Sequence, residues 1–181
     1  FHTNRHVATA YHVVEAGRDV SVRLHDGASR KASVVAIDPG RDLAILSLDE
    51  PVPGARTLTP SLEGLHVGQP VWVVGHPFAP HAQVDRRLVG LLDWSLSSGL
   101  VSTFNDDHIQ IDAAVNAGNS GGPVLDARGR VIGVISFEIR QGDGMGFAVA
   151  VSHLKALVED IDEEMAFWGG WSAEVGLGLS L

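Results

Sequence analysis

The sequence predicts an all-β sandwich or barrel that ends in one helix. Short apolar runs recur along the chain with turn-forming residues between them, which is typical of antiparallel strands joined by tight turns. One run alternates polar and apolar side chains with the period of a half-buried strand, and it places Val20, Val22 and Leu24 on one face. Helical spacing occurs only near the end of the chain.

The first half of the chain predicts a meander of short strands. Asp26-Gly27 marks one turn and Asp38-Pro39-Gly40 marks another, because these residues favour turn conformations and interrupt extended segments. The strands predicted here span residues 20–25, 30–37, 43–48 and 71–74.

The second half repeats this pattern after a segment of mixed charge and weak periodicity. We place the crossing between the halves in that segment, at residues 78–90, which gives an N-terminal half of residues 1–80 and a C-terminal half of residues 81–152. The strands predicted in the C-terminal half span residues 99–102, 108–112, 123–126, 131–137 and 146–150.

One amphipathic helix is predicted at residues 153–167. Ser152 is a suitable N-cap, and apolar side chains such as Leu154, Leu157 and Ile161 follow at helical spacing, with acidic residues on the other face. The remaining residues, 168–181, are predicted to be a linker or the start of a further, truncated domain.

Composition excludes several classes of function. The chain has 181 residues, a formal net charge of -9 and scattered basic residues, which argues against a nucleic-acid surface. Its apolar runs are far shorter than the ~20 residues of a membrane-spanning helix. It has no cysteine, so disulfides and thiol catalysis are excluded. It begins at Phe1 without a leader sequence, so we expect a fragment or a processed form.

The run Gly118-Asn119-Ser120-Gly121-Gly122-Pro123 points to acyl transfer. A serine between glycines on a tight turn exposes its hydroxyl beside free backbone N–H groups, but it needs a base to become a nucleophile. His12 and Asp42, which lie upstream, are the candidate partners.

The same run fits the loose G-x-S-x-G pattern of α/β-hydrolases, so an esterase of that class is an alternative. That fold places a helix after the serine and its Asp and His downstream. Here the residues after Ser120 read strand, turn, strand, and the order His, Asp, Ser is that of chymotrypsin-type enzymes.

Seven blocks of the sequence resemble the trypsin-like serine peptidases, and within them the HtrA/Deg type, from Phe1 to about Val158. The resemblance implies two packed six-stranded antiparallel β-barrels with a C-terminal helix, the first strand being truncated before Phe1. The tail from Val175 resembles the opening strand of a PDZ domain. The blocks are Thr9-Ala10-Tyr11-His12-Val13-Val14, Asp38-Pro39-Gly40-Arg41-Asp42-Leu43-Ala44-Ile45-Leu46, Gly75-His76-Pro77-Phe78, Gly99-Leu100-Val101-Ser102, Ile109-Gln110-Ile111-Asp112-Ala113, Asn116-Ala117-Gly118-Asn119-Ser120-Gly121-Gly122-Pro123 and Gly146-Phe147-Ala148-Val149.

The resemblance also assigns catalytic roles. It implies Ser120 as nucleophile, His12 as general base and then acid, and Asp42 as the carboxylate that orients His12. The backbone N–H groups of Gly118 and Ser120 would form the oxyanion hole. Asp112, which lies near the serine in sequence, is expected to be a structural carboxylate.

The substrate pocket follows from the same resemblance. Its floor would be Ala114, and one wall would follow Ile135, Ser136 and Phe137. Without a carboxylate at the floor, the pocket should reject Lys and Arg and accept small or medium aliphatic P1 side chains.

The expected function is hydrolysis of unfolded or damaged proteins through an acyl-enzyme, in the bacterial envelope or periplasm, as a monomer or a homo-oligomer. We expect no cofactor and no metal, since the pairs His2/His6 and His76/His81 lack further ligands. The alternative within the fold is a catalytically silent module that binds peptides in the same cleft.

Overall fold

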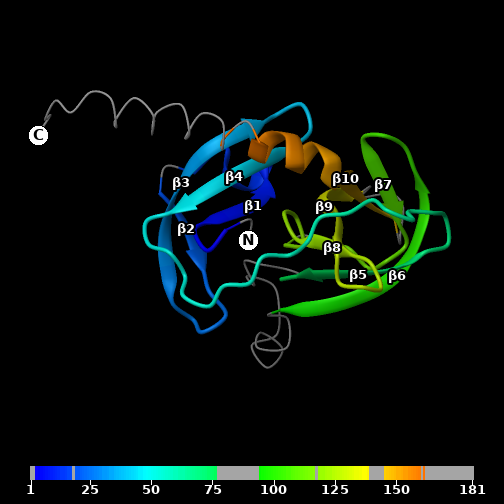
Figure 1. The fold of residues 1–181 in the computed structure, drawn as a ribbon, viewed down its shortest axis with the longest axis horizontal. Helices are drawn as coiled ribbons and strands as arrows, with labels where there is room; N and C mark the ends of the chain where they lie inside the picture. Colours follow the sequence, from blue (N-terminus) through cyan, green and yellow to red (C-terminus); the bar gives the residue numbers. More distant parts are fainter. Residues whose placement is uncertain are drawn as a thin grey trace, which may run out of the picture.

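Two β units lie side by side in the computed structural model, and a helix lies against both (Figure 1). The structure describes residues 3–17, 19–76, 94–116, 118–138, 145–159 and 161. The predicted tail at 168–181 lies outside these residues, and so does the crossing predicted at 78–90. Residues 70–75, which the prediction placed in the N-terminal half, form a strand of the C-terminal barrel, so the chain passes from one unit to the other before residue 70. The other predicted boundaries stay predictions.

The N-terminal unit is a four-stranded antiparallel sheet with the strand order β1-β4-β3-β2. A four-residue helix, α1 (Tyr11–Val14), follows the first strand. On one face of the sheet, Ala44 and Leu46 pack against Val14 of α1 and against apolar side chains of the neighbouring strands. The strands are β1 (His6–Ala10), β2 (Val20–Arg23), β3 (Ser29–Asp38) and β4 (Leu43–Leu48).

The C-terminal unit is a closed barrel with the order β10-β7-β6-β5-β8-β9. Alternate side chains point inward, as in β5, where Val71 and Val73 are fully buried between the half-exposed Trp72 and Val74. The strands are β5 (Pro70–Gly75), β6 (Ser95–Phe104), β7 (His108–Ile111), β8 (Pro123–Leu125), β9 (Val131–Glu138) and β10 (Gly146–Ala150).

The structure confirms the predicted fold class in that the described residues are mostly β strands and end in a C-terminal helix. The C-terminal unit is the expected six-stranded barrel. In the N-terminal unit the described residues form an open sheet of four strands where the resemblance implied six. Residues 123–125 after Ser120 form a strand and not a helix, which excludes the α/β-hydrolase fold and with it the esterase alternative.

The C-terminal helix, described at residues 151–159, joins the two units. Leu154 and Leu157 pack against Leu43 of β4 and against Val134 and Val149 of the barrel. Val158 and Ile161 contact Ile45 on the same strand, β4. This apolar face confirms the sequence-predicted stripe, and its partners belong to both units. No helix among the described residues is long and apolar enough to cross a membrane.

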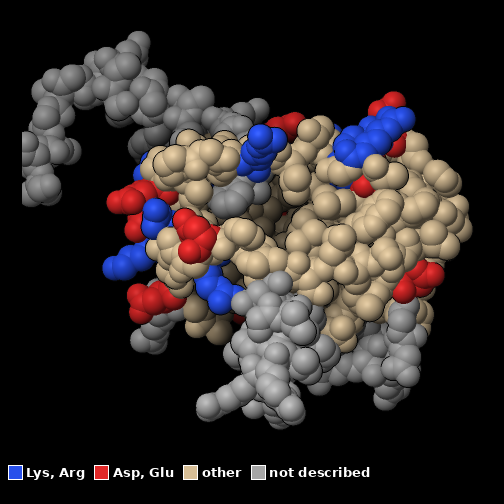
Figure 2. All heavy atoms as spheres, turned by 90° about the horizontal axis from the view of Figure 1, so that it is seen from below, with Lys and Arg blue, Asp and Glu red and all other residues tan. Residues whose placement is uncertain are grey.

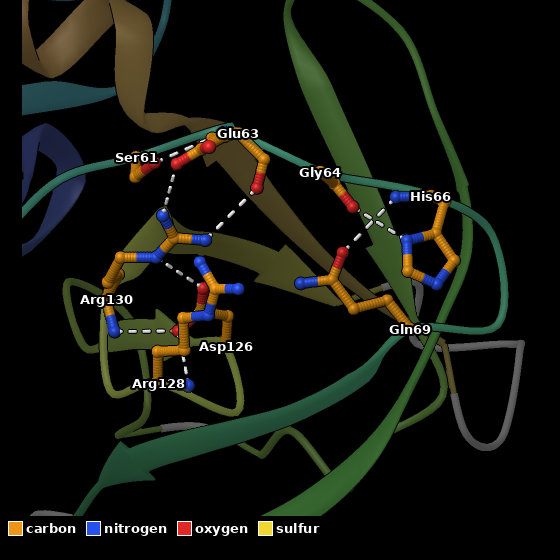
Figure 3. Close-up of polar contacts among 8 residues, drawn as sticks. All are labelled: Ser61, Glu63, Gly64, His66, Gln69, Asp126, Arg128 and Arg130. Atoms are coloured by element: carbon orange, nitrogen blue, oxygen red, sulfur yellow. Dashed lines mark hydrogen bonds and ion pairs between the residues drawn. The ribbon is translucent and has the colours of Figure 1, made fainter.

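The segment that connects the two units is attached to the barrel at residues 59–63, by backbone hydrogen bonds and by an ion pair (Figure 3). Thr59 and Ser61 exchange backbone hydrogen bonds of 2.9 Å with Val131. Next to them, the Arg130 guanidinium donates to both the side chain and the backbone carbonyl of Glu63, and to Asp126. The connection between the units is therefore tied to the β8–β9 turn.

Asp126 is the buried centre of this group, with 4% of its surface exposed. Burial opposes ionisation of its carboxyl, but the N–H groups of Arg130 and Arg128 and the Arg130 guanidinium outweigh it, so the pKa of Asp126 lies below its ordinary value. The carboxylate is thus a charged anchor within the β8–β9 turn.

Candidate active site

Ser120 lies on a turn that glycines make possible. Gly118 and Gly121 have φ angles of 100° and 82°, which favour glycine. Gly121 lies so close to Thr9 of β1 that a Cβ there would collide with the Thr9 hydroxyl, and its N–H donates to the Ile135 carbonyl at 2.7 Å. The turn is therefore wedged between the two units.

The backbone of this turn has defined hydrogen-bond directions. The Gly118 carbonyl accepts the N–H of His76 at 3.2 Å, and the Asn119 N–H donates to the Asn116 carbonyl at 3.0 Å. Within the described part of the chain, no acceptor takes the N–H of Gly118 or of Ser120. Those two groups are the donors that the resemblance assigns to the oxyanion hole.

His12 and Asp42 form a two-point contact on the N-terminal unit. The Asp42 carboxylate accepts the backbone N–H of His12 at 2.8 Å through Oδ1, and its Oδ2 lies 2.8 Å from His12 Nδ1. Since Oδ2 is an acceptor, Nδ1 carries the proton and Nε2 is left as the basic nitrogen. Asp42 itself has a φ of 56°, a left-handed backbone conformation that Asp adopts more readily than most residues.

Ser136 supplies the third hydrogen bond to this carboxylate, and it comes from the other unit. Its hydroxyl donates to Asp42 Oδ2 at 2.5 Å. The resemblance placed Ser136 in the pocket wall and did not link it to Asp42. The alternating burial of a strand could have indicated that neighbouring side chains of β9 point in opposite directions, but not which residue each would meet.

Ser120 also forms a hydrogen bond with Ser136. Its hydroxyl donates to the Ser136 carbonyl at 3.4 Å, a long hydrogen bond, and among the described residues no bond joins it to the His12 ring. The His12 side chain is 44% exposed. Hydrogen bonds between nucleophile and base are often long or unformed without substrate and shorten in the complex.

The predicted pocket residues are not all turned toward one space. The Ile135 side chain is fully buried in the barrel core, so only its backbone can line a pocket. Ala114 is exposed, and its carbonyl accepts the Ser97 hydroxyl at 2.8 Å. The Phe137 side chain lies outside the described residues.

Asp112 is placed differently from Asp42. Its Oδ1 accepts the backbone N–H of Leu100, and its own N–H donates to the Leu100 carbonyl. The structure therefore brings Asp42, and not Asp112, to His12.

A cleft of about 910 Å³ opens beside the serine turn, between the open sheet and the barrel. Valine and leucine side chains of the sheet line much of it, and on the barrel side it reaches Ser120, Asn119 and Trp94. The Trp94 ring contacts His76 and His25, with centroid distances of 4.5 Å and 5.4 Å. The face in Figure 2 is hollowed between the units and carries few charges over the barrel.

The arrangement as a whole defines a class. A His–Asp pair on one β unit and a glycine-flanked serine on an adjoining six-stranded barrel, in the chain order His, Asp, Ser, are the features of chymotrypsin-type hydrolases.

Comparison with known proteins identifies the family. A family model described as a trypsin-like peptidase domain matches residues 1–134. The chain belongs to this family, and within it to the HtrA/DegP type. An HtrA-type protease, AlgW with a decapeptide, has a TM-score of 0.74 and 29% identity over 89% of this chain and 49% of its own. The serine endoprotease from Yersinia pestis, at 22% identity and a TM-score of 0.73, supports the fold.

The sequence relatives carry the names of proteases. "Protease Do-like 1, chloroplastic" from Arabidopsis thaliana is 34% identical over 86% of this chain and 36% of its own length. A "Probable periplasmic serine endoprotease DegP-like" from Bartonella henselae is 34% identical over 92% of this chain and 33% of its own length. The chain therefore spans about a third of the length of these curated relatives.

Proposed function

We propose that this chain is the peptidase unit of a serine endopeptidase that cleaves unfolded or damaged proteins. The observation that carries the proposal is the Asp42 carboxylate, which accepts two hydrogen bonds from His12 and one from Ser136 beside the Ser120 turn. This contact fixes the imidazole in the tautomer that leaves Nε2 free to accept a proton. The names of the relatives support the same reaction.

The proposed reaction has two halves. Ser120 Oγ attacks the carbonyl carbon of the scissile peptide while His12 Nε2 takes the hydroxyl proton, and the oxyanion is held by the N–H groups of Gly118 and Ser120. His12 returns the proton to the leaving amine as the C–N bond breaks, which leaves an acyl-enzyme. Water then attacks the ester, with His12 again as base and Ser120 as leaving group.

The proposed preference is for small or medium aliphatic P1 side chains. Ala114 offers no charge to a cationic side chain, and an unpaired buried ammonium or guanidinium is unfavourable. Peptides that differ only at P1, as Val, Ala, Lys or Arg, test this preference. A kcat/KM for Lys or Arg equal to that for Val would contradict it.

Covalent labelling tests the reaction itself. A fluorophosphonate reacts with a serine only if that serine is activated, so we expect stoichiometric labelling of the wild type and none of Ser120→Ala. A folded wild type that binds peptides but takes no label would instead indicate the catalytically silent module.

The proposed location is the bacterial cell envelope or periplasm, and this rests on the names of the relatives, of which one is chloroplastic. A homo-oligomer stays a prediction from the resemblance.

A further inference from the structure

An ion-pair network joins the two units at Arg41, in the turn that carries Asp42. Arg41 directly precedes Asp42. Its Nη1 lies 3.0 Å from Asp38 Oδ2, within the same turn, and its Nε lies 3.6 Å from Asp107 Oδ1 in the barrel. Asp107 lies in the short loop between β6 and β7. Arg41 thus links the β3–β4 turn to the opposite unit.

Asp107 is held in place from several directions. Its Oδ1 lies 3.0 Å from His153 Nε2 of the C-terminal helix, and that nitrogen also lies 3.2 Å from the Asp106 carbonyl. Its backbone carbonyl accepts the Ala150 N–H at 2.9 Å, and its N–H donates to the Asn105 side chain. The carboxylate is therefore a fixed anchor, although its side chain is 52% exposed.

The position of this turn bears on the proposed chemistry because the catalytic residues are divided between the units. His12 and Asp42 belong to the sheet, and Ser120 belongs to the barrel. Among the described residues, two polar contacts tie residues 41 and 42 to the barrel, one between Asp42 and Ser136 and one between Arg41 and Asp107. Asp42, with its φ of 56°, is held between them.

We propose that Arg41, through Asp107, is a positioning residue that sets the place of Asp42 and His12 relative to Ser120. This inference rests on the proposed function. The pair is 45% and 52% exposed, so its effect is that of a surface ion pair, about twofold to fivefold in an equilibrium constant.

The experiment compares kcat and KM of the wild type with those of Arg41→Met, with rates expressed per fluorophosphonate-titrated site. We expect kcat to fall about twofold to fivefold at unchanged KM, because substrate contacts stay intact while the base is displaced. Arg41→Lys, which keeps the charge, should recover at least half of the lost rate. Asp107→Asn should lower kcat similarly, and the double variant should be no worse than Asp107→Asn alone.

A spectroscopic measurement gives a readout that needs no turnover. The Nδ1 proton of His12, hydrogen-bonded to Asp42 at 2.8 Å, should give a downfield proton resonance that exchanges with solvent faster in Arg41→Met than in the wild type.

Arg130→Met is the matched control. Arg130 also joins two loops by an ion pair, but it lies on the barrel side, with Asp126 and Glu63, and does not line the cleft. The Arg130→Met variant should have a lower free energy of unfolding than the wild type, with kcat and the His12 resonance unchanged.

The outcomes separate the two proposals. A wild type that takes no label and shows no turnover contradicts the proposed function. An active wild type whose kcat and His12 resonance are the same in Arg41→Met overturns the role of Arg41 alone. Equal losses in Arg130→Met, or additive losses in the double variant, overturn it as well.

Discussion

Asp42 accepts hydrogen bonds from both units, and the hydroxyl of Ser136 is the one that crosses between them. A hydrogen bond to a charged acceptor contributes more than one between neutral groups, about 1.5–3 kcal/mol. Ser136, a residue of β9, thus directly stabilises the carboxylate of Asp42, the proposed catalytic acid residue.

Removal of that hydroxyl tests its contribution. We expect Ser136→Ala to lower kcat about tenfold at little change in KM, because Asp42 loses one donor while the backbone of β9 stays in place. Steady-state kinetics with an aliphatic P1 peptide measure the effect. If Ser136 acts only as a pocket wall, KM and the P1 preference will change instead, and kcat will not.

Gly121 is the residue at which the serine turn and β1 approach most closely. Gly121→Ala adds a Cβ at a φ of 82°, where it would meet Thr9 and the backbone of Ala10. We expect the free energy of unfolding to fall by about 3 kcal/mol or more, measured by urea denaturation.

Gly129→Ala provides the control for that change. Gly129 also has a positive φ, of 72°, but a Cβ there would meet nothing within 4 Å. Only the backbone penalty of about 1–2 kcal/mol is expected. Equal losses in the two variants would show that the contact with β1 contributes nothing.

At the scale of elements, the β8–β9 turn depends on a carboxylate that must stay ionised. Because the pKa of Asp126 is lowered in the folded protein, its stabilisation is complete above its unfolded pKa of about 4 and is lost as the pH falls through the folded value. Wild type and Asp126→Asn should therefore differ by about 2 kcal/mol at pH 7 and converge below pH ~4.

Urea unfolding of both proteins at a series of pH values measures this convergence. A difference that stays constant down to low pH would mean that the charge of Asp126 makes no contribution.

The strands show how far the sequence could predict the elements. Residues 43–48 were predicted to be a strand, and they form β4 (Leu43–Leu48). This strand was predictable because a short run of apolar residues can be recognised in the local sequence alone. Of β6 only residues 99–102 were predicted, whereas the strand extends over Ser95–Phe104. Its serines have little local preference for a strand, and its register comes from pairing with β5.

The site was predictable in part for the same reason. The motifs around His12, Asp42 and Ser120 are local in sequence, and the structure brings His12 to Asp42 as expected. The contact between Ser136 and Asp42 joins residues 94 positions apart, so it depends on the docking of the units. Ile135 was expected in the pocket wall, but strand alternation turns its side chain into the barrel core.

The whole molecule is held together by the helix that contacts both units. Leu157 packs against Leu43 of the sheet and Val134 of the barrel. Leu157→Ala should therefore lower the stability of both units together, by about 2–3 kcal/mol, in one cooperative transition. Unfolding followed by far-UV and near-UV circular dichroism should give coincident curves.

Lys155→Ala is the control on the same helix, because the Lys155 side chain is exposed. The free energy of unfolding of this variant should stay within about 0.5 kcal/mol of the wild-type value. Two separate transitions, with only one shifted by Leu157→Ala, would contradict the coupling of the units.

Ser136 contacts both proposed catalytic partners with two different parts of one residue: its hydroxyl reaches Asp42, and its carbonyl accepts the hydroxyl of Ser120. Mutation can remove the first contact, but every amino acid carries a carbonyl, so no substitution at this position deletes the second. Substitutions at residue 136 can therefore change the hydrogen bonding of the proposed triad carboxylate while the resting position of the proposed nucleophile is preserved.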